Sequence, residues 1–254
     1  MAGYSRSVEE YLKVGKSMPN DELYEQLNAE LESIYGTIRT LRVNQHVFWE
    51  VQQIIGRNPA IHKPSTFYDW MGKMYIQAMT AAVRRLVDRR AGTVSFIRLL
   101  DKVKRNPSCF SRSAYKVRCG KAHLPDGYLD NDYDKLVGKG REEPDSATID
   151  AEIAALKKQT AILKRFVDEH VAHSAVNPSP DLPTFQDMDD AIDHLCRLVR
   201  RYLHLFRGVW ISDILPTWTF DWKEIFRYPW IPESSTYSIN AVDSHSPPEP
   251  PQSS

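Results

Sequence analysis

Helical spacing of apolar residues is the feature that most constrains the fold of this chain. Residues on one face of an α-helix recur every three or four positions, because the helix has about 3.6 residues per turn. Between residues 185 and 209 that spacing holds without a break, at Phe185, Met188, Ile192, Leu195, Val199, Tyr202, Phe206 and Val209. Thr184 and Asp187 stand at the start of the run in the pattern of a capping box. The sequence therefore predicts a long helix here that buries one face.

Three further long stretches show the same spacing, and no stretch alternates apolar and polar residues as a half-buried strand does. The predicted fold is therefore all-α, a helical bundle of four main helices at 20–58, 66–86, 149–173 and 185–209, with a shorter helix at 93–106. In the second helix, the expected buried face consists of Phe67, Met71, Met74, Ala78, Ala82 and Leu86.

Composition along the 254-residue chain sets the expected domain boundaries. Residues 107–145 are rich in glycine, proline and charge, which predicts a long irregular insertion with one short helix near residues 111–117. The expected order is an N-terminal arm (1–18), the helical bundle (19–209), a Trp-rich segment that covers a bundle end (210–232) and a disordered Ser/Pro-rich tail (233–254).

Several classes of protein are disfavoured by composition. No stretch is long and apolar enough for a membrane span, and the N-terminus is too polar for a secretory signal. Cys109, Cys119 and Cys196 form neither a CxxC pair nor a zinc-site pattern. We therefore expect a cytoplasmic protein with reduced thiols, no membrane contact, no metal site and no cofactor.

Charge is balanced over the whole chain but segregated within it. Residues 84–121 hold twelve basic and two acidic side chains, whereas eight acidic side chains follow between residues 126 and 150. A basic band of this kind can hold a phosphate backbone, which makes RNA an expected ligand. The alternative is that the two segments neutralise one another across the surface. The candidate RNA-binding residues are Arg112, Lys116, Arg118 and Lys121.

Two histidines end the predicted helix at 149–173. Its apolar face runs to Val167, the next position on that face is His170, and His173 lies about one turn further. Imidazoles exchange protons near neutral pH, and RNA carries its own nucleophile in the 2′-hydroxyl. A pair of histidines with a nearby arginine such as Arg165 is therefore a candidate set for RNA cleavage without a metal. Alternatively, the histidines pack in the core or at a subunit interface.

Two runs of sequence resemble a known family. They are RRLVDRRAGTVSFIRLLDKVKRNP at residues 84–107 and LKRFVDEHVAHS at residues 163–174. Together with the order of the helices, they resemble the AbiU-like abortive-infection branch of the HEPN superfamily. The resemblance implies an all-α HEPN-like bundle, commonly a dimer. Many active members are metal-independent ribonucleases, in which an arginine and a histidine face their counterparts across the dimer.

The resemblance carries over to particular residues with one departure. His173 matches the family histidine, but Val167 occupies the position of the usual arginine, six residues earlier. Arg165 and His170 satisfy a shorter spacing of the motif, although they point about 140° apart on a straight helix.

Two functions are therefore expected. The first is an RNA-cleaving or RNA-binding effector in phage defence, with His173, His170 and Arg165 as catalytic residues. It would form a homodimer through the helix that ends at His173 and could bind a partner protein. The alternative is a non-catalytic HEPN-like interaction or dimerisation module with a degenerate motif.

Overall fold

The computed structural model describes residues 21–120, 124–172 and 179–230, and all regular structure within these ranges is helical. The prediction of an all-α fold is confirmed. The predicted arm at 1–18 and tail at 233–254 lie outside the described residues. The helices are α2 (Asp21–Arg57), α3 (Thr66–Leu86), α4 (Phe96–Arg105), α5 (Arg112–Cys119), α6 (Tyr128–Val137), α7 (Ser146–Phe166) and α8 (Phe185–Arg207).

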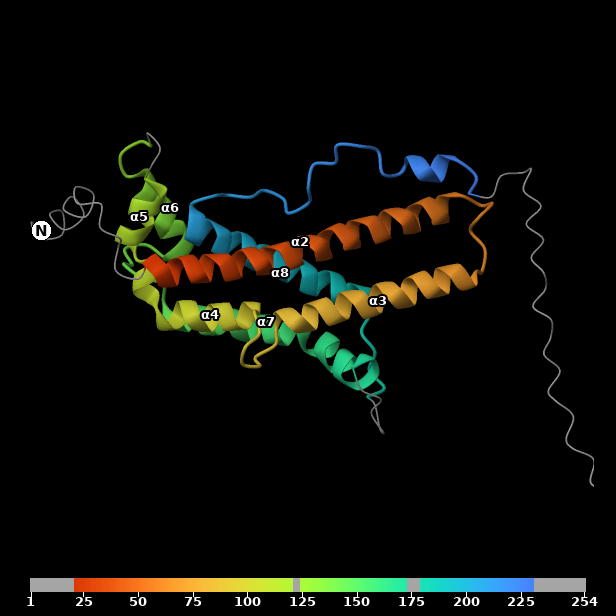
Figure 1. Cartoon of the computed structure of the whole chain (residues 1–254), viewed down its shortest axis with the longest axis horizontal. Helices are drawn as coiled ribbons and strands as arrows, with labels where there is room; N and C mark the ends of the chain where they lie inside the picture. Colours follow the sequence, from red (N-terminus) through yellow and green to blue (C-terminus); the bar gives the residue numbers. More distant parts are fainter. Residues whose placement is uncertain (1–20, 121–123, 173–178, 231–254) are drawn as a thin grey trace, which may run out of the picture. The chain divides into compact units, whose positions relative to one another are not determined.

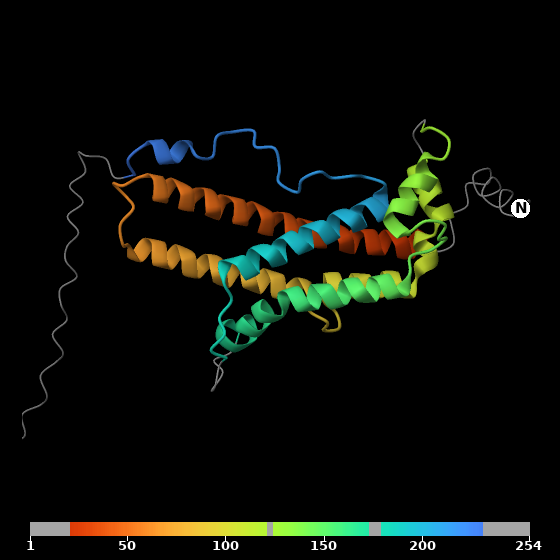
Figure 2. The same ribbon diagram turned by 180° about the vertical axis from the view of Figure 1, so that it is seen from behind.

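The chain divides into two compact units, one ending at Leu215 and the other beginning at Pro216. In the first unit, α8 packs against α2 on one side and α7 on the other. The helices α3 and α4 lie end to end along one side of the bundle, and both contact α2 and α7 (Figures 1 and 2). No helix in the described part of the chain has the length and hydropathy needed to cross a membrane.

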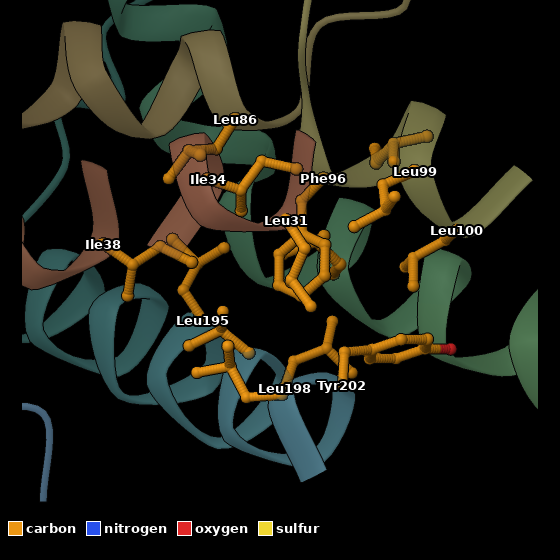
Figure 3. Packing of buried hydrophobic residues seen from close by; sticks show 14 of the residues in the cluster. Leu31, Ile34, Ile38, Leu86, Phe96, Leu99, Leu100, Leu195, Leu198 and Tyr202 are labelled. Carbon is orange, nitrogen blue, oxygen red and sulfur yellow. The ribbon is translucent and has the colours of Figure 1, made fainter. Parts of the chain in front are cut away.

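The core forms where the apolar faces of these helices meet. Figure 3 shows Leu31, Ile34 and Ile38 of α2 in one cluster with Phe96 of α4 and Leu195 of α8. All five side chains are at most 1% exposed. The three-to-four spacing predicted from the sequence is therefore the spacing of the residues that fill this core in α2, α7 and α8.

Residues 107–145 are more regular than their composition predicted. They contain a 3-10 turn at Pro107–Phe110 followed by α5 and α6. Tyr133 of α6 is fully buried, and its hydroxyl donates to the carbonyl oxygens of Phe110 and Glu142 at 2.7 and 3.1 Å. Gly127 and Gly138 flank α6 with positive φ, so these glycines mark the ends of a helix rather than an irregular segment.

The buried face of α3 also differs from the prediction. Phe67 and Met74 are 47% and 42% exposed, while Met79 and Val83 of the second half are buried. The reason is that α3 begins beyond the start of α8, where α2 and α3 run on as a pair of bundle helices (Figure 1). A helix with one neighbour buries a narrower stripe than a helix with three.

The described part of the second unit, residues 216–230, is held by contacts among its own aromatic side chains. The ring centroids of Trp218 and Trp222 lie 6.0 Å apart, and those of Phe226 and Trp230 lie 5.8 Å apart. The boundary at Pro216 divides the predicted Trp-rich segment, because Trp210 belongs to the first unit. That this segment covers a bundle end stays a prediction.

Replacing Tyr133 tests whether residues 107–145 are folded as described. Tyr133→Phe should lower the free energy of unfolding by roughly 1–3 kcal/mol, because two carbonyl oxygens lose their hydrogen-bond donor. Urea unfolding followed by circular dichroism measures the change. Tyr128→Phe is the matched control, because the Tyr128 side chain is 49% exposed. Equal stabilities of the two variants would contradict a folded insertion.

Candidate functional site

A cleft of about 890 Å³ lies between α7 and the loop that joins α3 to α4. The loop is the yellow segment between these helices in Figure 1. The cleft is lined on one side by the end of α3, the loop and α4, through Arg84, Val87, Asp88, Arg89, Arg90 and Ile97. The other side is the second half of α7 and the turn after it, through Lys157, Thr160, Ala161, Lys164, Arg165, Asp168 and Glu169. The two sequence runs at 84–107 and 163–174, which are far apart in the chain, therefore both contribute to one cleft.

An ion-pair network joins the two walls. Arg84 of α3 donates through Nε to Asp168 Oδ1 at 2.7 Å, and its Nη1 lies 3.2 Å from Asp88 Oδ2. Lys164 binds the other oxygen of Asp168. Burial alone would raise the pKa of Asp168, but the hydrogen bonds from Lys164 and Arg84 outweigh it and hold that pKa below the ordinary value. Asp168 is therefore ionised at neutral pH and holds α3 against the end of α7.

The loop that carries Arg89 and Arg90 is ordered by polar contacts. Asp88 accepts hydrogen bonds from the backbone N–H of Arg90 at 3.0 Å and from its Nε at 2.9 Å. Arg98 of α4 donates to the carbonyl oxygen of Arg90 at 2.8 Å, and buried Ser95 donates to that of Asp88. The side chains of Arg89 and Arg90 remain 52% and 71% exposed at the cleft. The loop therefore presents two cations on a fixed backbone.

The predicted helix 149–173 changes form before its end. After Phe166 the chain makes a π-helical turn, Val167–Val171, closed by a 2.8 Å hydrogen bond from the Ala172 N–H to the Val167 carbonyl oxygen. Val167 is 3% exposed and ends the buried face of the helix. His170 is exposed and stacks on Phe166 with ring centroids 5.2 Å apart. The prediction that His170 continues the buried face is wrong, because the wide turn shifts the residues after Val167 off that face.

The predicted catalytic residues are not gathered in one place among the described residues. Arg165 lines the cleft and pairs with Asp181 at 3.3 Å, whereas His170 contacts Phe166 and does not line the cleft. His173 lies outside the described residues. Catalysis by these three residues therefore stays a prediction.

The predicted RNA-binding residues are occupied by contacts within the chain. Arg112 binds Asp134 at 2.5 Å and lies 3.5 Å from carboxylate oxygens of both Asp130 and Glu142. Lys116 also pairs with Asp130, at 2.8 Å. These pairs match the alternative in which the basic and acidic segments neutralise each other.

Arg118 and Lys121 complete the predicted set. The Arg118 guanidinium lies 3.6 Å from the centroid of the Tyr24 ring, and burial lowers its pKa. Lys121 lies outside the described residues. RNA binding by the four predicted residues stays a prediction.

Sequence reasoning missed the residues that build the cleft. Arg84, Arg89 and Arg90 were counted in the basic band but not chosen, because composition does not tell which cations are paired. One signal in the sequence could have pointed to the cleft. Lys164 and Asp168 are four residues apart, a spacing that places an ion pair on one face of a helix. Among the described residues, no group of three or more His, Cys, Asp or Glu side chains is arranged to hold a metal ion.

The fold and the cleft define the class of protein. Two segments that resemble HEPN sequence runs form facing walls of one cleft in an all-α bundle, as expected of an HEPN-like domain. The chain belongs to the AbiU2 family of HEPN proteins, whose HEPN_AbiU2 model it matches over residues 20–228. No curated protein and no solved structure matches the chain. The family match extends past the predicted bundle end at residue 209 and into the second unit.

Asp168→Asn should destabilise the protein near neutral pH, and the difference from wild type should vanish in acid. The native pKa of Asp168 is depressed, so its ionised form stabilises the fold above the unfolded pKa of about 3.9. That contribution is lost as the pH falls through the lower native pKa. Urea unfolding at about pH 7 and at stepwise lower pH, through about pH 3 and below, follows this loss.

The control is Asp126→Asn, at an exposed position that does not line the cleft. It should leave stability nearly unchanged at every pH. An effect of Asp168→Asn that is as large below about pH 3 as near pH 7 would contradict a stabilising ion pair.

Proposed function

We propose that this protein is an abortive-infection effector that binds RNA in the α3–α7 cleft and cleaves it without a metal. One observation carries the proposal: the two HEPN-like runs meet through the ion pair of Arg84 and Asp168, and Asp168 lies in the turn that precedes His173 in the sequence. The family supplies the biological context, since the chain matches the AbiU2 family model and its sequence resembles the abortive-infection branch of the HEPN superfamily.

Charge in the cleft supports a polyanionic ligand. The lining holds six basic side chains and three acidic ones, a balance of about +3 in a chain whose formal net charge is zero. Lys157 has no carboxylate partner in the described part of the chain, and Arg89 lies 3.5 Å from its only carboxylate contact there. Cations in this state can exchange solvent for phosphate oxygens at little cost in broken pairs.

The proposed chemistry uses the 2′-hydroxyl of the RNA as the nucleophile. One imidazole takes the proton of that hydroxyl as its oxygen attacks the adjacent phosphorus. A second imidazole gives a proton to the departing 5′-oxygen as the phosphorus–oxygen bond breaks. His173 has the leading role and His170 assists, while Arg165 stabilises the charge on the phosphate.

A second protomer completes the proposed site. Arg165 lies in the cleft and His170 lies outside its lining, so we infer that the histidines that act with Arg165 come from a second protomer. Two protomers that pair the ends of their α7 helices can bring the arginine of one toward the histidines of the other. A homodimer is therefore part of the proposal, and dilution below the dimer dissociation constant should reduce cleavage.

One observation favours the alternative function. Val167 occupies the usual arginine position of the family motif and is buried in the core. A protein with this degenerate motif can keep the HEPN-like fold and dimer surface while it acts only in binding. This alternative predicts RNA binding or protein assembly with no cleavage.

Cleavage should require the histidines and no metal. Purified full-length protein is expected to cleave single-stranded RNA in the presence of EDTA, and expression should arrest growth. His173→Ala should reduce the rate by about 100-fold or more, the usual range for losing a general acid or base. His62→Ala is the matched control, because His62 is exposed in the loop between α2 and α3. Undiminished cleavage by the His170→Ala, His173→Ala double variant would disprove the assignment.

RNA binding should depend on the cleft more than on the predicted residues outside it. Lys157→Glu, at a cleft residue with no carboxylate partner in the described part of the chain, should weaken binding and reduce the slope of log affinity against log salt by about one, since one phosphate contact is lost. Lys116→Glu should have a smaller effect, because Lys116 is already paired with Asp130. Fluorescence anisotropy with labelled RNA at several salt concentrations measures both. The reverse order of effects would place RNA at the surface around Lys116 instead.

A further inference from the structure

A second pocket, of about 910 Å³, lies where α6 meets the C-terminal half of α8. Figure 2 shows these two helices side by side. None of its lining residues lines the α3–α7 cleft, so the two sites are separate. The polar and aromatic side chains that a ligand would meet here include Tyr128, Lys135, Arg197, Arg200, His204 and Trp210.

Positive charge exceeds negative charge in the lining of this pocket. No carboxylate in the described part of the chain pairs with Lys135, Arg197 or Arg200. Arg201, the next cation of the lining, is already held in an ion pair. One carboxylate, that of Asp132, also lines the pocket. Three unpaired cations against this one carboxylate leave a surplus of two positive charges, which favours a ligand with two negative charges.

A hydrogen-bond acceptor and a donor at the same place lack partners. His204 is 8% exposed, and its Nε2 lies 2.8 Å from Oδ2 of Asp132. Because the carboxylate accepts, Nε2 of the neutral ring carries the hydrogen, and Nδ1 is left as an acceptor. This Nδ1 and the donor Nε of Arg200 are buried and have no hydrogen-bond partner among the described residues. Such groups are uncommon in folded proteins, so they mark a place where a ligand can supply both a donor and an acceptor.

The turn after α8 places an indole beside these two atoms. Gly208 ends α8 with φ of +64°, and a Cβ there would lie 2.6 Å from the Cys119 sulfur, so only glycine permits this turn. The ring centroids of Trp210 and His204 lie 5.6 Å apart, and the Arg200 guanidinium lies 5.3 Å from the Trp210 centroid. Trp210 is nevertheless 64% exposed, so its side chain can turn toward solvent and let a ligand reach both atoms. An aromatic group of that ligand can then pack on the indole.

We propose that this pocket binds the C-terminus of a partner polypeptide, whose last residue is aromatic and is preceded by an acidic residue. The terminal carboxylate binds Arg197 and Arg200, because a guanidinium matches the two oxygens of a carboxylate. The acidic side chain binds Lys135, so that two carboxylates balance the surplus charge. The last backbone N–H donates to Nδ1 of His204, and the aromatic side chain packs on Trp210.

Simpler anions meet fewer of these requirements. A free amino acid brings an ammonium group, which the unpaired cations repel. An inorganic anion has no apolar part to pack on the indole of Trp210. An acidic segment within a chain has no terminal carboxylate beside its last N–H. The proposal does not depend on the proposed RNA cleavage.

Isothermal titration of the full-length protein with the peptide acetyl-Gly-Gly-Glu-Phe tests the proposal. The peptide with a free C-terminal carboxylate should bind saturably at one site per chain. The same peptide with a C-terminal amide should bind about tenfold more weakly or worse, the effect of losing one charge-assisted contact. Arg200→Ala should weaken binding of the carboxylate peptide by a similar factor. Trp210→Ala should remove the preference for phenylalanine over alanine as the last residue of the peptide.

The matched control is Arg57→Ala, at the exposed last residue of α2, which does not line the pocket. It removes the same charge and should bind the peptide as wild type does. Circular dichroism checks the fold of each variant, and Arg200→Gln and Lys135→Ala replace Arg200→Ala if that variant does not fold.

Three results of the peptide titrations would overturn the proposal. They are no saturable binding at millimolar concentration, equal binding of the carboxylate and amide peptides, and wild-type affinity of the folded Arg200 variant. Binding of AMP that is tighter than binding of the peptide, and that is lost in the same variant, would also overturn it.

Discussion

Burial of the apolar face of α8 is the constraint on which the rest of the first unit depends. Ile192, Leu195 and Val199 are fully buried, and α2 and α7 pack on the helix from either side. At roughly 25 cal/mol per Å² of apolar area removed from water, such burial is the main favourable term in folding. Polar contacts then fix the positions of the helices, as when the Tyr24 hydroxyl of α2 donates to the Phe206 carbonyl oxygen of α8 at 2.7 Å.

The fold was predictable where one physical effect dominated. Apolar spacing identified α2, α7 and α8, and the capping box at Thr184 and Asp187 is present at the start of α8. Apolar spacing did not identify α6, because the buried face of this helix includes Asp132 and the glycines at its ends are typical of an irregular segment. Tyr133, the fully buried residue that anchors α6, looks like any other tyrosine in sequence.

The site was less predictable than the fold because it depends on pairing between distant residues. Twelve basic residues in one span indicated a polyanion surface, but that count does not show that Arg112 binds Asp134 or that Arg90 binds Asp88. Surface charges are separated into structural pairs and available cations only by the fold. The cleft is lined both by such ion pairs and by cations without a partner, which only the fold brings together.

Burial of Val167 also limits where a catalytic arginine can stand. An arginine at that position would bring a charge into the core, which costs several kcal/mol unless it is paired. The motif cannot therefore be restored on this face of α7 without a change in the π-helical turn. If the protein cleaves RNA, the cation at the phosphate comes from Arg165 or from another element. Where it comes from Arg165, the proposed chemistry depends on how two α7 ends pair, whereas the binding hypothesis needs no such pairing.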